Sequence, residues 1–270
     1  MSMLRANLMA IWGRAYVRIV GVNREPSWIL FDVIFPMLGV ASYAYIYKAM
    51  NASREFMGFA ILGGAMTAYW MNVIWSMASQ FYWEKQNGNL ELFFVAPTSR
   101  MAILLGMAFG GMVTSTTRAV AVILFGMLVF GVRFTFSSFP LAVLAFILTV
   151  VALYGLGMML SSVFLMYGRD AWHMANLMQE PVYLISGLYF PVKALGFWAA
   201  LAGSIIPLTL GLDAIRQLSF STAPTGFLPV KWEIAGLSCL TVLLFFGASR
   251  SLAYMEKLAK REGRLTLKWQ

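Results

Sequence analysis

Charged residues are scarce in this sequence, and so are cysteine and histidine. Only 11% of the 270 residues are charged and 60% are hydrophobic, whereas a soluble domain carries about 25% charged residues. The single cysteine, Cys239, excludes an intrachain disulfide. The single histidine, His173, has no companions for a metal site or a nucleophilic triad. The composition therefore predicts an all-α integral membrane protein and not a globular domain with a large core.

Negative charge is also in deficit, because the formal net charge is +9. The basic residues are not gathered on one soluble segment, so nucleic acid is a poor explanation for them. Cytoplasmic flanks of membrane spans favour Lys and Arg, and this excess is expected to orient the chain in a bilayer. The N-terminus has no compact apolar core followed by a small-residue cleavage site, so no signal peptide is expected.

Long apolar runs predict six membrane spans of about 20 residues or more within a single domain, residues 1–270. The spans cover residues 28–49, 56–83, 101–132, 139–166, 171–190 and 232–254. Residues 1–27 place apolar side chains at steps of three and four against arginines, which predicts an amphipathic helix in the membrane interface. Trp12 and Tyr16 are then expected at headgroup level. Residues 255–270 form a basic tail.

One apolar segment, residues 188–212, is broken by Gly196, Gly203 and Pro207. It is either a seventh span or a re-entrant pair of short helices. With six spans, thirteen Lys and Arg lie on the cytoplasmic side and six on the outer side, with Arg118 inside a span, which accounts for all 20. A seventh span would move the tail and its bases to the outside. The positive-inside rule therefore favours six spans, both termini in the cytoplasm, and an outer re-entrant segment covered by protein.

A polar stretch, residues 84–99, separates the second and third spans, and we call it the coupling segment. Gly88 and Asn89 are expected to break the preceding helix, and the Asn89 side chain to cap the next one by accepting a backbone N–H bond. Residues 90–95 then form about two helical turns. Pro97 stops them, and Thr98 or Ser99 caps the following helix. A short helix held at a membrane face could transmit the push of another molecule to the spans.

Two stretches of sequence resemble motifs of type-2 ATP-binding-cassette permeases, in the branch that exports drugs and lipids. The coupling segment resembles the family's loop between the second and third spans, with Asn89 where threonine is usual. Residues 186–191, 206–209 and 213–216 resemble the family's outer re-entrant segment. The two motifs fall on opposite sides of the topology inferred from charge, as the family requires, and the resemblance covers nearly the whole chain.

The resemblance implies a permease subunit that works with a second permease copy, identical or different, and with separate ATP-binding-cassette ATPase subunits. No Gly-x-x-x-x-Gly-Lys-Ser/Thr loop occurs, because none of the seven lysines follows a glycine. ATP and Mg²⁺ are thus expected on the partner ATPase, and no cofactor, metal or catalytic residue on this chain. The expected ATPase-coupling residues are Glu84, Gly88, Asn89, Leu90, Glu91, Phe93, Phe94 and Pro97.

Within this set, Phe93 and Phe94 would fill a cleft on the partner, while Glu84 and Glu91 would pair with its basic residues. The alternative is an ordinary interfacial loop helix with its aromatic side chains among the lipid headgroups.

Polar residues at membrane depth are costly and usually face a cavity or each other. Arg118, near the middle of the third span, either lines a transport pathway, or snorkels toward the interface or pairs within the protein. Glu180 precedes Pro181 and shares a helical face with Asn176 and Tyr183, a line that suits a lumen or a subunit seam. The alternative is a pairing that satisfies the proline kink. Asn72 and Ser76 form a second polar line on the second span.

These observations predict the permease subunit of an ATP-driven exporter in the inner cell membrane. It would move a hydrophobic or amphipathic substrate, such as a drug, a natural product or a lipid, out of the cytoplasm or the inner leaflet. The alternative is export of a lipid-linked polysaccharide. A polytopic membrane enzyme would need His, Asp or Ser clustered at one membrane face, and an ion channel would need a filter or a charged ring.

Overall fold

The structure is a computed structural model that describes residues 3–24, 26–167, 169–220 and 226–261. Within these ranges the chain is built from helices, turns and loops, with no strand. The elements are α1 (Met3–Asn23), α2 (Pro26–Ala49), α3 (Arg54–Asn72), η1 (Val73–Ala78), α4 (Gln80–Gln86), α5 (Leu90–Val95), α6 (Arg100–Phe130), α7 (Phe139–Tyr167), α8 (Arg169–Ile185), η2 (Val192–Leu195), α9 (Phe197–Gly203), α10 (Pro207–Ser219) and α11 (Val230–Arg261).

Four helical stretches of the described chain are long and apolar enough to cross a membrane. They are Arg54–Gln86, which joins α3, η1 and α4, and then Arg100–Phe130, Phe139–Leu165 and Val230–Leu258. The short helices α9 and α10 are bent by 112° at the break between them, as in a broken span or a re-entrant loop. In α2 the described apolar stretch is shorter, Val33–Ala49. An α-helical membrane protein is thereby confirmed, and six crossings stay a prediction.

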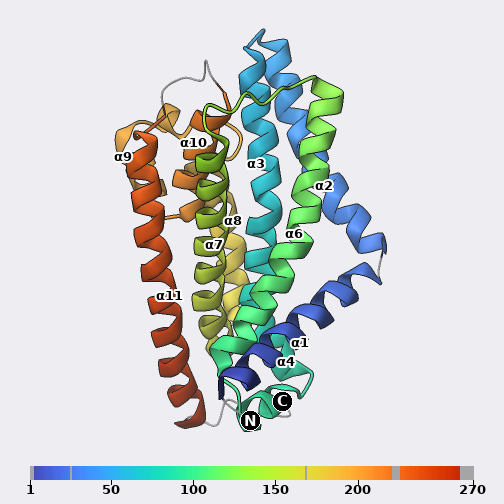
Figure 1. Ribbon diagram of the computed structural model, residues 1–270, viewed down its shortest axis with the longest axis vertical. Helices are drawn as coiled ribbons and strands as arrows, with labels where there is room; N and C mark the ends of the chain where they lie inside the picture. The colour runs from blue at the N-terminus through green and yellow to red at the C-terminus, as the bar shows by residue number, and fades with distance from the viewer. Residues whose placement is uncertain (1–2, 25, 168, 221–225, 262–270) are drawn as a thin grey trace.

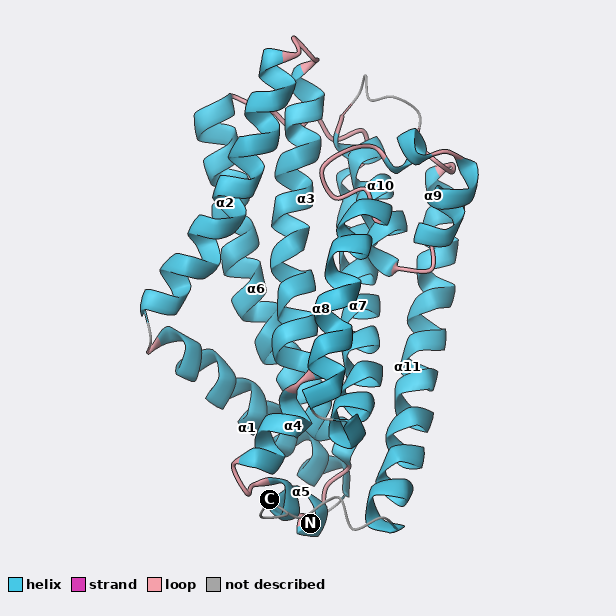
Figure 2. Ribbon diagram, turned by 180° about the vertical axis from the view of Figure 1, so that it is seen from behind, coloured by secondary structure: helices cyan, strands magenta, loops and turns pink. Residues whose placement is uncertain are grey.

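The helices form an elongated bundle with two distinct ends (Figures 1 and 2). The first turns of α1, the short helices α4 and α5, and the last turns of α11 lie together at one end. The turn between α2 and α3 and the helices α9 and α10 lie toward the other end. The two segments singled out in the sequence, the coupling segment and the broken apolar segment, therefore occupy opposite ends of the bundle.

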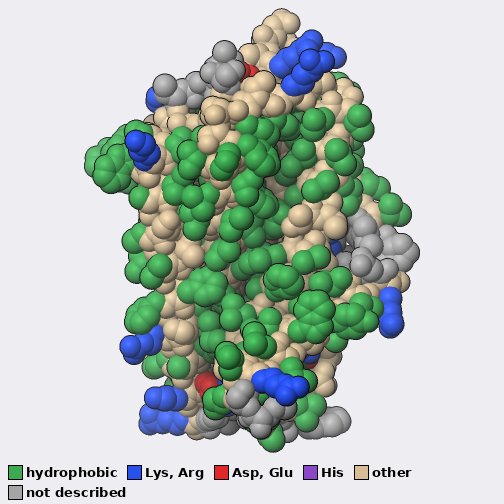
Figure 3. Space-filling model, in the orientation of Figure 1, with side chains coloured by type: hydrophobic (Ala, Val, Ile, Leu, Met, Phe, Trp, Pro, Cys, Tyr) green, Lys and Arg blue, Asp and Glu red, His purple; other side chains and the backbone are tan. Residues whose placement is uncertain are grey.

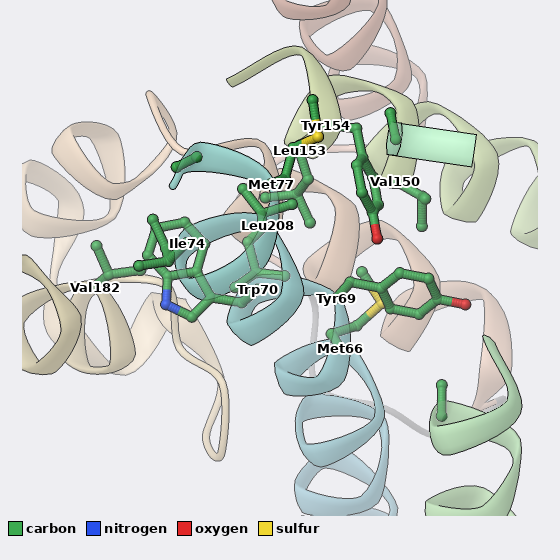
Figure 4. Close-up of a cluster of buried hydrophobic side chains, with 14 of the residues drawn as sticks. Met66, Tyr69, Trp70, Ile74, Met77, Val150, Leu153, Tyr154, Val182 and Leu208 are labelled. Carbon is green, nitrogen blue, oxygen red and sulfur yellow. The ribbon is translucent and has the colours of Figure 1, made fainter. Parts of the chain in front are cut away.

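The centre of the bundle is formed by the second span, which is buried along most of its length. Tyr69 and Trp70 of α3 and Leu153 and Tyr154 of α7 are among its buried side chains (Figure 4). The helix α6 packs against α1 and α3, whereas α7 packs against α11 and α10. This arrangement puts α3 behind the space between α6 and α7.

The fifth predicted span ends earlier than the sequence indicated. Residues 171–190 were expected to be helical, but α8 stops at Ile185 and Gly187 adopts a positive φ of 62°. Chain reversal at this point turns the next carbonyl groups inward, where the buried side chain of Arg216 binds them. An arginine supplied from α10 thus replaces the helical hydrogen bonds that residues 186–190 would otherwise form.

Candidate functional site

The coupling segment begins where α4 ends in a tight helix-terminating turn. Gly88 has φ +72°, a conformation that residues with a Cβ rarely adopt. The backbone N–H of Asn89 donates to the carbonyl of Glu84 at 2.9 Å, and that of Gly88 to the carbonyl of Lys85 at 3.1 Å. These two bonds define a Schellman motif. The predicted helix break at Gly88 is therefore confirmed.

The predicted capping role of Asn89 is wrong. Asn89 already has helical backbone angles, φ −83° and ψ −16°, and its side chain makes no capping hydrogen bond. Instead its Nδ2 donates to Oε2 of Glu84 at 3.2 Å. The turn runs directly into α5 and brings the amide beside a carboxylate, and a charged acceptor gives the stronger hydrogen bond.

The C-terminal end of α5 and the start of α6 lie where the sequence predicted them. The helix spans Leu90–Val95, and Ala96 is extended with ψ 137°, as expected for a residue that precedes proline. Ser99 caps α6, because its Oγ accepts a hydrogen bond from the backbone N–H of Ala102 at 3.1 Å. The short helix is thus fixed at both ends by local backbone chemistry.

Glu84, near the end of α4, is buried, and its carboxylate faces α1. It forms an ion pair with Arg14 of α1 and accepts a hydrogen bond from Nε2 of Gln80 at 3.0 Å. Together with Asn89, these contacts give both carboxylate oxygens a partner inside the chain. Glu84 thus holds α1, α4 and the turn before α5 together, in place of facing outward toward a partner's base.

The exposed apolar face of α5 is formed by Leu92 and Val95, which are 66% and 84% exposed. Leu90 is buried, and Phe93 is partly buried with the Arg14 guanidinium 4.6 Å from its ring centre. Of the residues at this surface, Phe93 was predicted from the sequence, whereas Leu92, Val95 and Arg14 were not. A step of three residues from Leu92 to Val95 was the available signal. The side chains of Glu91 and Phe94 lie outside the described residues.

The helix α1 is joined to this region at two further points. Near its start, Oδ1 of Asn7 accepts a hydrogen bond from the backbone N–H of Ser99 at 2.9 Å. One turn beyond Arg14, Arg18 hydrogen-bonds to Ser76 and, at 3.3 Å, to Oε1 of Gln80. Burial lowers the pKa of Arg18, the Tyr154 hydroxyl opposes the shift, and the charges of Arg118 and Arg14 add to it. The coupling segment and α1 therefore form one connected unit, which we call the coupling unit.

The two residues of the predicted polar line on the second span, Asn72 and Ser76, contact the coupling unit through Arg18. Asn72 is buried, and its Oδ1 accepts from the Tyr154 hydroxyl at 2.9 Å and from Arg18 at 3.4 Å. Ser76 lies in η1, a π-helical turn, and its hydroxyl also bonds to Arg18. Both residues thus connect the second span to α1, and Asn72 also connects it to α7.

The π-helical turn reaches a third helix as well. Nε1 of Trp75 donates to Oε1 of Gln179 on α8 at 3.1 Å. Such turns inside longer helices occur often at functional sites. Here the turn lies between the coupling unit and α8.

A cavity of about 230 Å³ brings together two of the predicted pathway residues, Arg118 and Tyr183. Elements α2, α3, α6 and α8 contribute to its wall, and the Tyr183 hydroxyl donates to the sulfur of Met71 at 3.1 Å. Asn176 and Glu180, from the same predicted line, are exposed on α8 and do not line this cavity. His173 is also exposed. Among the described residues, no group of three or more His, Cys, Asp and Glu could hold a metal ion.

At the opposite end, Arg216 of α10 is fully buried and binds four backbone carbonyl groups. The acceptors are Gly187, Leu188, Phe190 and Phe59, at distances between 2.6 and 3.0 Å. Arg216 thereby ties the turn after α8 to α3. The sequence placed Arg216 in a family-like motif, and its contacts explain why a buried cation is tolerated there.

Comparison with known proteins places these features in one context. A family model described as ABC-2 type transporter matches residues 7–220. The protein called inner membrane transport permease YadH from Escherichia coli K12 is 24% identical over 203 residues, which cover 72% of this chain and 76% of that protein. The permease of the same name from Shigella flexneri gives the same identity and coverage.

Proposed function

The chain belongs to the ABC-2 type transporter family and is a membrane subunit of such a transporter, and we propose that it exports a hydrophobic or amphipathic substrate. Members of this family work with ATP-binding-cassette ATPases, so a separate ATPase chain supplies the energy, with ATP and Mg²⁺ bound there. The chain acts beside a second permease copy, identical or different. It crosses the inner membrane six times, with α5 and both termini on the cytoplasmic side.

The observation that carries this proposal is the exposed apolar face of α5 on an otherwise fixed helix. Leu92 and Val95 point away from the bundle, while Glu84 and Arg14 hold the helix base. A helix that is anchored at its base and apolar on its outer face suits docking to another protein. A force applied to it would reach α1 through Arg14 and α3 through the π-helical turn. The coupling unit is therefore the element through which the ATPase moves the spans.

The proposed substrate class rests on the cavity between α2, α3, α6 and α8. Its wall is mostly apolar or aromatic, with Arg118 and the hydroxyl groups of Thr67, Tyr183 and Tyr189 as the polar groups. An apolar wall with a few convergent polar groups fits an amphipathic molecule. A drug, a natural product or a lipid has this character. A lipid-linked polysaccharide is the alternative substrate that the transport test below distinguishes.

Purified alone, the chain is expected to hydrolyse no ATP, because its sequence carries no phosphate-binding loop. Co-expressed with its cognate ATPase, it should give a complex that releases phosphate and moves a lipophilic dye across proteoliposome membranes. Both activities are measured with and without a catalytically inactive ATPase variant. ATP hydrolysis by the isolated chain, with contaminants excluded, contradicts the proposal. Transport of a lipid-linked glycan without transport of lipophilic dyes favours the polysaccharide alternative.

Placing a charge on the outer face of α5 is expected to weaken ATPase docking. Burial of a Leu or Val side chain contributes about 1.5–3 kcal/mol, so Leu92→Asp and Val95→Asp should each raise the Kd of the complex at least about tenfold. Gln86→Asp is the matched control, since it adds the same charge at an exposed position of α4. The Kd is measured by fluorescence titration in detergent. Unchanged binding by both α5 variants would show that the ATPase docks elsewhere.

A further inference from the structure

Two adjoining cavities form one apolar slot on the face of the bundle between α6 and α7. Their volumes are about 190 Å³ and about 250 Å³. They share the wall residues Leu62, Ile123, Phe146 and Ile215, so they are continuous. The slot opens because α6 packs against α1 and α3, while α7 packs against α11 and α10. It is separate from the cavity that contains Arg118, which shares no wall residue with it.

The slot presents almost no free hydrogen-bonding group. At its inner end the Tyr69 hydroxyl lies 2.8 Å from the Thr116 hydroxyl, which in turn donates to the Met112 carbonyl at 2.7 Å. The remaining wall is aliphatic or aromatic apart from Ser219. Apolar cavities of this size stay dry and bind apolar ligands. A water-filled or polar-ligand site is therefore a poor match.

The mouth of the slot lies where a membrane would surround the protein. Its walls come from α3, α6 and α7, which belong to stretches long and apolar enough to span a bilayer, with Leu212, Ile215 and Ser219 added from α10. The rim residues Val120 and Val143 are both exposed, on opposite walls. Apolar side chains cover the middle of this face, and Lys and Arg side chains lie around its edge (Figure 3). Acyl chains are the medium at such a surface.

We propose that the slot binds one acyl chain of a membrane phospholipid. The chain enters beside Phe134 and Phe136, in the connection that follows α6, and ends near Tyr69. Arg133, in the same connection, is exposed, and no ion pair to it is found among the described residues. It is placed to meet the phosphate group of that lipid. The bound acyl chain fills the space between α6 and α7 and packs against both helices, as the side chains between two closely packed helices do.

The test uses the full chain in vesicles of phosphatidylethanolamine and phosphatidylglycerol, with a trace of phosphatidylglycerol that carries a photoreactive diazirine within one acyl chain. After illumination, mass spectrometry maps the labelled residues. Labelling is expected to concentrate on the slot wall, at Ile123 and Phe146, above that at Leu128. Leu128 is the reference because it is 84% exposed on the same helix but outside the slot.

Two variants that fill the slot from opposite walls are Val120→Trp and Val143→Trp. Each should reduce labelling of the slot wall to the level of Leu128, and Leu128→Trp should leave it unchanged. Equal labelling of the slot and Leu128 in the unmodified chain overturns the proposal, as does slot labelling that both tryptophans leave intact. Protein–protein crosslinks across the slot also overturn it, because they show a second copy there. The lipid readout requires no ATPase and does not depend on the proposed transport function.

Discussion

Gly63→Ala is expected to prevent the chain from folding into a stable protein. A Cβ built at Gly63 of α3 would lie 1.5 Å from the carbonyl oxygen and 2.5 Å from the carbonyl carbon of Leu188. Both atoms are backbone, so no rotamer change relieves the clash. Either α3 or the turn after α8 must move. Closely approaching backbones of this kind are a main reason for glycine inside membrane helices.

The displacement would also affect Arg216. Its Nη2 donates to the Leu188 carbonyl at 2.6 Å and to the Phe59 carbonyl at 2.9 Å, so it spans the gap that the new methyl group would widen. A hydrogen bond to a charged group contributes about 1.5–3 kcal/mol. Loss of two such bonds around a buried guanidinium, added to the steric cost, approaches the stability of a whole domain, about 5–15 kcal/mol.

Gly13→Ala is the matched control for this substitution. Gly13 lies in α1 with nothing within 4 Å of a built Cβ, and alanine in a helix is about 1 kcal/mol more favourable than glycine. Yield, size-exclusion profile and thermal unfolding of the two variants are compared. We expect no monodisperse Gly63→Ala protein and a normal Gly13→Ala protein. A Gly63→Ala chain that purifies and unfolds like the unmodified one would contradict the close approach of α3 and Leu188.

The backbone of the coupling segment was predictable because its determinants are local. Gly88, Pro97 and Ser99 each act on their own backbone or on residues within three positions, and the sequence displays them directly. The bounds of α5 follow from these signals alone. The role of Asn89 was not predictable in the same way, since this residue type can cap a helix or bind a nearby carboxylate. Only the distance to Glu84 decides between these roles, and a sequence contains no distances.

Side-chain partners far apart in the chain were not predictable. Arg14 and Glu84 are 70 positions apart, and Arg18 meets Ser76 across a similar separation. The sequence indicated an interfacial helix for residues 1–27, and it left open which face its arginines occupy. In the structure Arg14 and Arg18 turn toward α4 and η1, while Leu8 and Trp12 are exposed. Tertiary packing sets the rotation of α1, because Glu84 offers the arginines a fixed anionic partner.

The fifth span shows the same limit in another form. Apolar composition continues past Ile185, so hydropathy extended the helix to about residue 190. The helix ends earlier because α10 presents a buried cation that needs carbonyl acceptors, and Gly187 can adopt the turn that supplies them. The cation and the turn are nearly 30 positions apart, and neither alone indicates the other.

Glu84→Ala is expected to uncouple the transporter. The substitution leaves Arg14 without its carboxylate and removes the acceptor for Gln80 and Asn89. Losing one partner of a buried pair costs about 3–5 kcal/mol, and the partial exposure of Arg14 reduces this to about 2 kcal/mol. The loss falls on the junction of α1, α4 and α5. We therefore expect α5 to lose its fixed position while the spans stay folded.

A double-mutant cycle of Arg14→Gln, Glu84→Gln and both changes together isolates this pair. The measurements are the unfolding midpoint of the chain and the substrate-stimulated ATPase activity of the assembled complex. A coupling free energy of about 1–2 kcal/mol is expected, because removal of either charge already breaks the pair. Glu256→Gln is the control. It breaks a partly buried pair with Arg100 at the same end, 3.1 Å apart, without touching α5.

The control should keep ATP hydrolysis responsive to substrate, whereas each single change at the Arg14–Glu84 pair should reduce the response at least about fivefold, equivalent to about 1 kcal/mol. The effect arises because the ATPase then moves α5 without moving α1 and the second span. The expected coupling free energy in the unfolding midpoints, together with an undiminished substrate response, would mean that the pair only stabilises the fold. Force would then reach the spans by another route, of which the direct chain connection from α5 through Ser99 into α6 is the shortest.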